Sequence, residues 1–351
     1  MSEPGQHTYP EIVGQAEAWT EALQVAAAAG EPLRRLWRDA GARRLLFIGC
    51  GSTYYLSLAA AALARARGLT AWAAPASEVW LFPEMHAAGI EDTLLVAVSR
   101  SGSTTETVRA VESYRRAGGK AAVTVGCYPD EALPRVCDLT VAVPKGQEVS
   151  VAQTRSFASM FVACQVLLGA LAGENDTAAR LADLPERAAR LLDEYAGLAA
   201  RLGADMSVQR FFFLGDGPRY GLACETMLKM KEMSLSYSEA FHFLEFRHGP
   251  KSVVNDQSLV IGLVGDRALP QEAAVLTDMQ ALGARTLVLA EDPEVPELRA
   301  ADYAVRLASG LGDLERAGLC LPVLQLLAFR RALANGQDPD NPHNLTQVVT
   351  L

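Results

Sequence analysis

The sequence predicts an α/β protein with two tandem, doubly wound units, each a parallel sheet flanked by helices. Short β-rich runs alternate with longer helical patterns, and such alternation is typical of parallel strands joined by helical crossovers. The alternation occurs twice, on either side of an Ala/Leu-rich helical stretch at 151–202 that carries no strand pattern. The two sets of strands also contain related segments, which indicates an internal duplication.

The first set of predicted strands begins with RRLLFIGCG at 43–51, a buried run that ends in glycine. A helix is predicted at 52–68, with Gly68 as its stop signal. An amphipathic helix is predicted at 104–119, between the third and fourth strands. The remaining strands of this set are LTAWAAP at 69–75, DTLLVAVS at 92–99, KAAVTVGCY at 120–128 and LTVAVPKG at 139–146.

The second set of predicted strands repeats features of the first. FLGDGPRYG from Phe213 aligns with FIGCGSTYY from Phe47, so that a phenylalanine, two glycines and a tyrosine coincide. LVIGLVGDR likewise aligns with LLVAVSRSG. The strands of this set are RFFFLGDG at 210–217, SLVIGLVGD at 258–266, ARTLVLAED at 284–292 and DYAVRLAS at 302–309.

Hydroxyl side chains follow two strands of the first set, and each group opens a helix. They lie in GCGSTY at 49–54 and in SRSGSTTET at 99–107, of which we name residues 99–104 the serine loop. Ligands of open α/β sheets bind at the carboxyl ends of the strands, and a helix N-terminus attracts anions. A phosphate ester fits such a site. N-capping is the alternative, but it needs only one hydroxyl for each helix.

The second copy has lost these hydroxyls. Pro218 and Arg219 stand opposite Ser52 and Thr53, and Val264–Asp266 stand opposite the start of the serine loop. The sequence therefore predicts one phosphate site per chain. GCGSTY is a poor dinucleotide fingerprint because its third glycine position is tyrosine, and no G-K-[ST] motif for a nucleoside triphosphate is present.

Composition and charge exclude some classes of binding partner. The 351 residues are 50% hydrophobic and 21% charged, with a net charge of −9, so we expect neither nucleic acid nor an anionic membrane as a partner. The N-terminus does not resemble a signal peptide, and the longest apolar runs look too short to span a bilayer. The six cysteines are scattered, which predicts small buried side chains in a reducing cytoplasm rather than disulfides or a zinc site.

A predicted helix from about Leu222 to Ser234 is dense in reactive side chains. Glu225, Lys229 and Glu232 follow spacings of four and three, so they share one face. A solvated ion pair is the simple interpretation, but the apolar neighbours favour a face directed into a cleft. His248 follows in the turn sequence HGP, and histidine transfers protons readily near neutral pH. A carboxylate and a histidine suit proton transfer beside a sugar carbonyl without a metal or nucleotide.

Several segments together resemble a known family: FIGCGSTYY, VSRSGSTTETV, SVAQTRSF, ETMLKMKEMS, EFRHGPKS and the tail NPHNLTQVVTL. They are similar to the tandem sugar isomerase (SIS) domains in the isomerase half of glucosamine-6-phosphate synthase. They are more similar still to its stand-alone relatives, the hexosamine-6-phosphate deaminases and isomerases and the fructosamine-type deglycases. The resemblance implies flavodoxin-like SIS domains at 29–190 and 191–335, a helical segment at 1–28 and a tail at 336–351 over the active site.

The resemblance also implies roles for individual residues. Glu232 would move the proton between C1 and C2, with Lys229 beside it on the same helix. His248 would assist ring opening and reach the site from the neighbouring subunit, which implies a homodimer. No cofactor and no metal are expected. The residues expected to bind the sugar phosphate are Gly51, Ser52, Thr53, Ser99, Arg100, Ser101, Thr104, Val151, Ala152, Gln153, Glu225 and Gln347.

Two departures from the synthase bear on the reaction. The synthase carries an N-terminal glutaminase domain with a cysteine after the initiator Met, whereas this sequence has Ser2, and we expect no such domain before the first SIS unit. The tail lysine of the synthase falls on Gln347, whose amide cannot form a Schiff base with a ketose. These departures favour a substrate that already carries its nitrogen.

We therefore expect a cytoplasmic isomerase or deaminase of an amino-sugar 6-phosphate, of the glucosamine-6-phosphate type. One alternative is a fructosamine-6-phosphate deglycase, which would use the same site for a bulkier amine. Another, of a different class, is a non-catalytic sugar-phosphate sensor, although no helix-turn-helix pattern precedes the first SIS unit. A synthase subunit that receives ammonia from a separate partner is a third possibility. The sequence leaves open which sugar is bound.

Overall fold

The computed structural model describes residues 3–348, which divide into two compact units. The first unit comprises residues 14–149, 153–185 and 346–348. The second comprises residues 3–13, 150–152 and 186–345.

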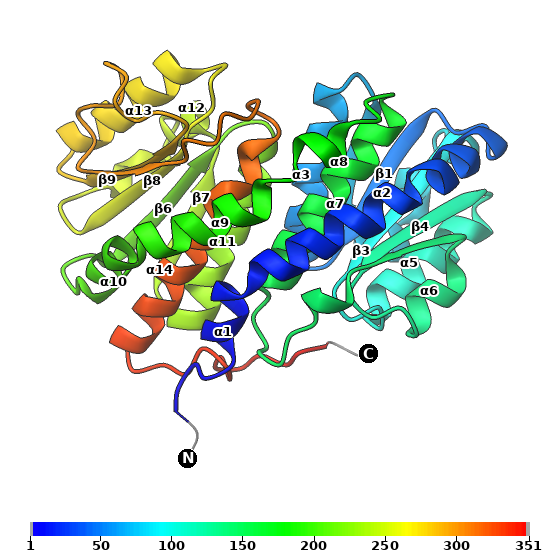
Figure 1. Cartoon of the computed structure of the whole chain (residues 1–351), viewed down its shortest axis with the longest axis horizontal. Helices are drawn as coiled ribbons and strands as arrows, with labels where there is room; N and C mark the ends of the chain where they lie inside the picture. The colour runs from blue at the N-terminus through cyan, green and yellow to red at the C-terminus, as the bar shows by residue number, and fades with distance from the viewer. Residues whose placement is uncertain (1–2, 349–351) are drawn as a thin grey trace. The chain divides into compact units, whose positions relative to one another are not determined.

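The first unit contains a five-stranded parallel sheet of order β2-β1-β3-β4-β5, which is the flavodoxin-like order (Figure 1). All five predicted strands are confirmed. The chain passes from β1 to β2 on one side and then from β2 past β1 to β3 on the other, so the switch point of the sheet lies between β1 and β3. The strands are β1 (Arg44–Gly49), β2 (Thr70–Pro75), β3 (Thr93–Ser99), β4 (Ala121–Gly126) and β5 (Leu139–Ala142).

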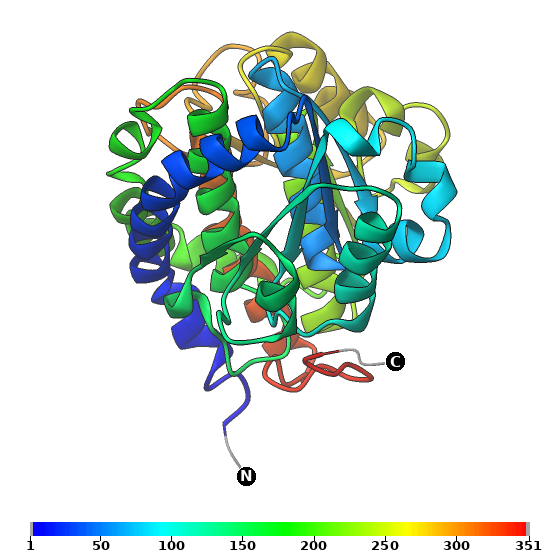
Figure 2. The same cartoon turned by 90° about the vertical axis from the view of Figure 1, so that its right-hand side faces the viewer.

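Helices cover both faces of this sheet, as the fold class predicts (Figure 2). One layer contains α2, α3 and α7, which pack together, and α4, α5 and α6 form the other. The α-helices are α2 (Gln15–Asp39), α3 (Ser52–Ala66), α4 (Ala76–Leu81), α5 (Thr105–Arg116), α6 (Ala132–Val136), α7 (Arg155–Leu171) and α8 (Thr177–Arg180). Short 3₁₀ turns are η1 (Pro83–His86), η2 (Ile90–Asp92) and η3 (Pro144–Gly146).

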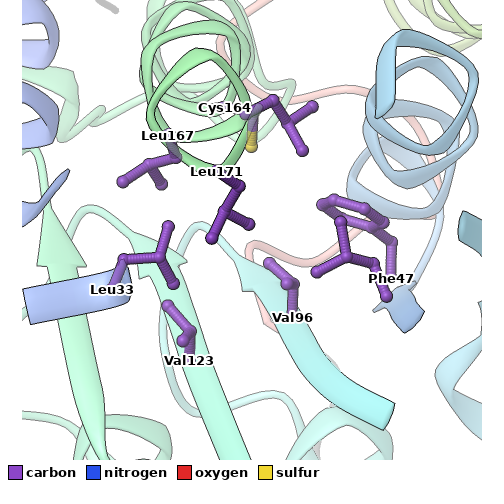
Figure 3. Close-up of a pocket in the computed structure, with 9 residues that line it drawn as sticks. Leu33, Phe47, Val96, Val123, Cys164, Leu167 and Leu171 are labelled. Atoms are coloured by element: carbon purple, nitrogen blue, oxygen red, sulfur yellow. The ribbon is translucent and has the colours of Figure 1, made fainter. Parts of the chain in front are cut away.

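The alternation of side chains along each strand supplies two apolar cores. Leu46 of β1 and its register partner Leu95 of β3 belong to the core beneath α4 and α5. Phe47 and its partner Val96 point to the other face, toward Leu33 of α2 and the side chains of α7 (Figure 3). Because both faces of the strands are buried, their sequences are nearly continuous apolar runs.

The second unit repeats the topology with a parallel sheet of order β10-β9-β8-β6-β7 (Figure 1). The register repeats as well, because Arg44 pairs with Thr93 and the aligned Arg210 pairs with Ser258. The predicted duplication is thus visible in the fold. The strands are β6 (Arg210–Gly215), β7 (Tyr237–Phe241), β8 (Ser258–Leu263), β9 (Arg285–Ala290) and β10 (Tyr303–Arg306).

Two sequence-based assignments in the second unit need correction. Strand β7 was not predicted, because it is an edge strand of mostly half-exposed residues without a buried apolar run. The carboxylate helix α11 begins at Pro218, earlier than the predicted start near Leu222, since proline is compatible with the first turn of a helix.

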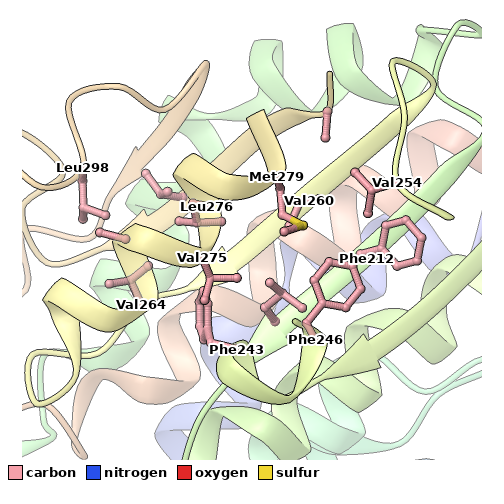
Figure 4. Close-up of a cluster of buried hydrophobic side chains, with 14 of the residues drawn as sticks. Phe212, Phe243, Phe246, Val254, Val260, Val264, Val275, Leu276, Met279 and Leu298 are labelled. Carbon is pink, nitrogen blue, oxygen red and sulfur yellow. The ribbon is translucent and has the colours of Figure 1, made fainter. Parts of the chain in front are cut away.

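Helices α12 and α13 of the second unit pack on one face of its sheet around a core that contains Phe212, Phe243 and Met279 (Figure 4). The α-helices are α1 (Thr8–Val13), α9 (Leu184–Glu194), α10 (Ala196–Ala204), α11 (Pro218–Ser234), α12 (Phe243–Phe246), α13 (Leu269–Ala281) and α14 (Leu321–Ala334). The 3₁₀ turns are η4 (Pro250–Val253) and η5 (Arg316–Cys320). The chain passes from the first unit to the second within α9.

Two helical segments have the length and hydropathy of a membrane span, Arg155–Ala172 and Arg316–Ala334. The expectation that every apolar run is too short was therefore wrong on length alone. In both segments 83% of the apolar window is buried inside the protein, as in core helices.

The cysteines behave as small apolar side chains, as predicted. Cys127, Cys164, Cys224 and Cys320 are buried, while Cys50 and Cys137 are half-buried. Burial raises the pKa of each of the six thiols, so they stay protonated near neutral pH.

Close packing at the end of β1 requires glycine at position 49. A Cβ atom there would lie 2.4 Å from the carbonyl carbon of Thr53, at the start of α3. Gly49→Ala should therefore lower the free energy of unfolding by ~1–3 kcal/mol, measured by urea denaturation. Gly197→Ala, in the first turn of α10 and with no atom within 4 Å of the added Cβ, is the control and should be neutral or stabilising. Equal losses in both variants would contradict the packing argument.

Candidate functional site

The first unit places both hydroxyl segments at the carboxyl ends of adjacent strands, on either side of the switch point. Strand β1 leads into Ser52 and Thr53 at the start of α3, and β3 leads into the serine loop and α5. Two helix N-termini therefore open at one edge of the sheet. This is the position at which open α/β sheets bind ligands, and helix N-termini favour an anion there.

The turn between β1 and α3 depends on Gly51 and Thr53. Gly51 adopts φ 55° and ψ −123°, a conformation that favours glycine. The Thr53 hydroxyl donates to the Cys50 carbonyl at 3.0 Å and accepts from the Cys50 amide at 2.9 Å. Thr53 thus closes the turn before α3 but is not its N-cap, because the N-cap residue is Gly51 and, among the described residues, no side chain caps this helix. The predicted contact of Thr53 with phosphate stays a prediction.

Hydroxyl groups also shape the serine loop. Ser99 Oγ accepts the amide of Gly102 at 3.1 Å, and Gly102 has φ 68°. Ser101 Oγ accepts the amide of Ser103 at 3.3 Å and lies 3.4 Å from Oγ1 of Thr104. Ser101 and Ser103 also line a cavity of about 190 Å³, which a ligand or water can enter.

Arg100, in the centre of the loop, pairs with a carboxylate that the sequence analysis did not single out. Its Nη1 lies 3.4 Å from Oε2 of Glu148, and both side chains are buried. Glu148 Oε1 also accepts the amide of Thr154 at 2.6 Å and its hydroxyl at 2.8 Å, and both Glu148 oxygens bind Ser156. Glu148 therefore joins the serine loop to the start of α7.

The tail contacts the same pair. Arg100 Nη2 donates to the Gln347 carbonyl at 2.9 Å, and Gln347 Nε2 donates to the Glu148 carbonyl at 2.9 Å. Gln347 and Val348 line the cavity beside the serine loop, together with Tyr128 and Glu131. Gln347 and Val348 of the predicted tail thus lie beside the serine loop. The placement of the tail over an active site stays a prediction, and its residues 349–351 lie outside the described residues.

In the second unit, helix α11 presents the three predicted charged residues as one buried group. Lys229 Nζ lies 3.5 Å from Oε1 of Glu225 and 2.5 Å from Oε2 of Glu232. The Lys229 and Glu225 side chains are 1% and 0% exposed, whereas Glu232 is 20% exposed. The simple interpretation as a solvated pair was wrong. Of the two carboxylates, Glu232 is the one that a substrate can reach.

His248 lies in an exposed turn after α12, as predicted, and its amide donates to the Glu245 carbonyl at 2.9 Å. Within residues 3–348 its imidazole makes no hydrogen bond or ion pair. Val151 and Ala152 belong to the second unit and Gln153 to the first. The predicted joining of the serine loop with Glu232 and His248 spans both units and remains a prediction.

The second unit has its own switch point, between β6 and β8, and it lacks the serine loop. The amide of Gly265 donates there to Oε2 of Glu272 at 2.8 Å. Burial raises the pKa of Glu272 to about 7, although the hydrogen bond from Gly265 opposes this shift. Glu272 is therefore a buried acid that titrates near neutral pH.

A model of the SIS domain matches residues 40–170 and 206–334, one match for each sheet. The chain belongs to the SIS domain family. This membership confirms the resemblance drawn from the motifs, and the two five-stranded parallel sheets confirm the fold class.

Among curated SIS proteins, glutamine–fructose-6-phosphate aminotransferase (isomerizing) of Xylella fastidiosa strain 9a5c is 30% identical over 322 residues. The match covers 89% of this chain and 52% of that protein, so the chain spans about half the length of this relative. The corresponding enzyme of Acidithiobacillus ferridurans is 30% identical over 362 residues, and the match covers 97% of this chain and 58% of that protein.

Solved structures share the fold. Tagatose-6-phosphate ketose/aldose isomerase of Escherichia coli superposes with a TM-score of 0.86 at 23% identity, covering 98% of each chain. Glucosamine-6-phosphate deaminase of Thermotoga maritima superposes with a TM-score of 0.70 at 24% identity, and the match covers 94% of this chain and 100% of that one. The C-terminal domain of glucosamine-fructose-6-phosphate aminotransferase of Francisella tularensis superposes with a TM-score of 0.82 at 22% identity. The match covers 95% of this chain and 97% of that one.

The buried Arg100–Glu148 pair predicts a large loss of stability when one partner is removed. Glu148→Ala leaves a buried guanidinium without its carboxylate and should cost ~3–5 kcal/mol of unfolding free energy in urea denaturation. Glu112→Ala removes the partner of Arg109 in an exposed pair and should cost less than ~1 kcal/mol. Similar losses in the two variants would show that Glu148 does not stabilise the loop.

The raised pKa of Glu272 predicts a pH dependence of stability. The carboxyl of Glu272 has its ordinary pKa of 4.5 in the unfolded chain and a pKa of about 7 in the folded one, so the folded state holds the proton more tightly. The stabilising contribution of protonated Glu272 is complete below pH 4.5 and lost as pH rises through 7. Glutamine cannot titrate, so Glu272→Gln should not lose this contribution. Its unfolding free energy minus that of wild type should therefore increase by on the order of 3 kcal/mol between pH 4.5 and pH 8, measured by urea denaturation at each pH. A pH-independent difference would contradict the assignment.

Proposed function

We propose that the chain is a cytoplasmic SIS enzyme that isomerises or deaminates an amino-sugar 6-phosphate of the glucosamine-6-phosphate type. The observation that carries the proposal is the buried Lys229 ammonium, which binds a partly exposed carboxylate, Glu232. Six cysteines with protonated, mostly buried thiols suit the reducing cytoplasm.

The phosphate anchor in this proposal is the serine loop. Ser101 and Ser103 line a cavity between the serine loop and the loop after β4, and α5 opens directly after them. Hydroxyl donors, amides of a helix N-terminus and the nearby guanidinium of Arg100 complement a phosphate dianion. Because Glu148 balances the charge of Arg100, we expect neutral donors to supply most of the hydrogen bonds to phosphate.

Glu232 is the proposed proton carrier. Lys229 fixes one of its oxygens at 2.5 Å, and Glu225 in turn faces Lys229 from one helical turn away at 3.5 Å. Lys229 thus positions the Glu232 carboxylate. Because the Lys229 side chain is buried, it is held in one conformation while it does so. An oriented carboxylate within hydrogen-bond reach of C1 and C2 is what a proton transfer between them requires.

The proposed reaction begins with ring opening, to which His248 contributes from its exposed turn. Glu232 then takes the proton from C2 and returns it to C1, which turns a 2-amino aldose into a ketose imine. Water adds to C2 of the imine, the C2–N bond breaks and ammonia leaves, so a ketose 6-phosphate remains. In this proposal the chain is a homodimer in which His248 serves the neighbouring subunit.

The position of Gln347 supports a substrate that carries its own nitrogen. Both ends of this residue are bound, its carbonyl to Arg100 and its amide nitrogen to the Glu148 carbonyl. An amide has no nucleophilic amine for a Schiff base. One structural neighbour points in the same direction, since it is named as a glucosamine-6-phosphate deaminase.

The Glu232→Gln variant tests the proton transfer. It keeps the size and hydrogen-bonding shape of the side chain but cannot carry the proton. We expect kcat for ammonia release from glucosamine 6-phosphate to fall by ~10²–10⁴-fold, with substrate binding retained in a thermal-shift assay. Glu194→Gln, on the surface of α9, should leave both unchanged.

Three outcomes decide between the proposal and its rivals. Undiminished turnover of the Glu232→Gln variant would remove Glu232 from the reaction. Release of an amino acid from a fructosamine 6-phosphate, with no ammonia from hexosamine 6-phosphates, would identify a deglycase. Stabilisation by sugar phosphates without any turnover would identify a sensor.

A further inference from the structure

The internal duplication allows the two switch points to be compared residue by residue. Gly217, at the turn from β6 to α11, has φ 55° and ψ −129°, nearly the conformation of Gly51 at the turn from β1 to α3. A Cβ at Gly215 would lie 2.5 Å from the Arg219 carbonyl oxygen, and one at the aligned Gly49 would lie 2.5 Å from that of Thr53. The two turns therefore have the same geometry, and α11 starts as close to its sheet as α3 does.

A carboxylate of the protein lies at the switch point of the second unit. Asp313 Oδ1 accepts from Arg219 Nη2 at 2.8 Å, from Arg316 Nη2 at 3.0 Å and from the Asp266 amide at 3.0 Å. Its Oδ2 accepts from Arg219 Nη1 at 3.2 Å. These donors come from the start of α11, the loop after β8 and the turn η5, so they converge on one anion from three directions.

The donors around Asp313 stand at the positions of the predicted phosphate ligands. In the alignment of the two copies, Arg219 corresponds to Thr53 and Asp266 to Ser101. Asp313 itself lies in the loop after the fifth strand of its sheet, between β10 and α14. Glu148 occupies the equivalent loop of the first unit, but it binds Arg100 and the start of α7, while Ser101 and Ser103 line a cavity.

The charges at the second switch point keep Asp313 an anion. Burial opposes its ionisation, but Arg219 and the Asp266 amide more than compensate and lower the pKa of its carboxyl. The side chains of Arg219 and Arg316 are 6% and 2% exposed, so they need nearby negative charge. Asp266 and Glu291 supply further charge beside Arg316.

We propose that the β6/β8 switch point is an anion site filled by the protein's own carboxylate, Asp313, which stands where a phosphate would bind. Removing this carboxylate should open a site for a small oxyanion such as inorganic phosphate. The proposal explains why the duplication leaves one sugar-phosphate site per chain: in the second unit the equivalent donors are already used. It rests on the geometry of the second unit and holds whether or not the chain is a deaminase.

The experiment is a calorimetric titration of inorganic phosphate into full-length wild type and Asp313→Ala at constant ionic strength. Asp313→Ala should bind one phosphate more per chain than wild type does, whatever number the first unit binds. Its melting temperature should also rise more with phosphate than with chloride at equal ionic strength, because phosphate replaces the lost carboxylate. The double variant Arg219→Met/Asp313→Ala, which lacks the main donor, should lose the additional phosphate.

Asp205→Ala is the matched control. Asp205 also pairs with an arginine, Arg285, and its side chain is 28% exposed against 25% for Asp313, but it lies away from the switch point. It should bind no additional phosphate. The inference is overturned if Asp313→Ala binds no more phosphate than wild type and gains no more thermal stability from it. If that variant does not fold in phosphate-free buffer, its recovery by phosphate but not by chloride makes the same distinction.

Discussion

The structure depends on a close approach of a helix to the end of a strand, which only glycine allows. At Gly49 in the first unit and Gly215 in the second, a Cβ would lie within 2.5 Å of backbone atoms in the next helix. This constraint fixes α3 and α11 with their N-termini at the carboxyl ends of β1 and β6. A helix N-terminus held there attracts an anion. The turn between the strand and the helix is the same in both halves of the chain, so both favour an anion at this position.

The two halves differ in what satisfies that preference. In the first unit, short hydroxyl side chains leave a cavity beside the loop, and the buried Arg100–Glu148 pair holds the loop and the tail. In the second unit, the long side chain of Arg219 and the carboxylate of Asp313 lie at the corresponding place. The second unit also carries the buried Glu225–Lys229 pair and the partly exposed Glu232 on α11. In the proposed function the first unit binds the phosphate and the second supplies the proton carrier.

Much of the fold could be predicted because the central strands are buried on both faces and are continuous apolar runs. Strand β7 could not, since an edge strand such as YSEAF needs no such run. The spacing of Glu225, Lys229 and Glu232 predicted their shared face, because i+3 and i+4 neighbours meet on any helix. Glu148 and Asp313 were missed, because Arg100 lies 48 residues from Glu148 and Arg219 lies 94 residues from Asp313 along the chain. Local patterns do not report contacts that only the folded sheet creates.

The most direct test of the account is a crystal structure of the Glu232→Gln variant with glucosamine 6-phosphate. The account predicts one sugar phosphate per chain, with its phosphate on Ser101 and Ser103 and its C2 within ~3–3.5 Å of the side chain at position 232. A phosphate bound at the β6/β8 switch point, or a sugar whose C1 and C2 lie far from position 232, would contradict it.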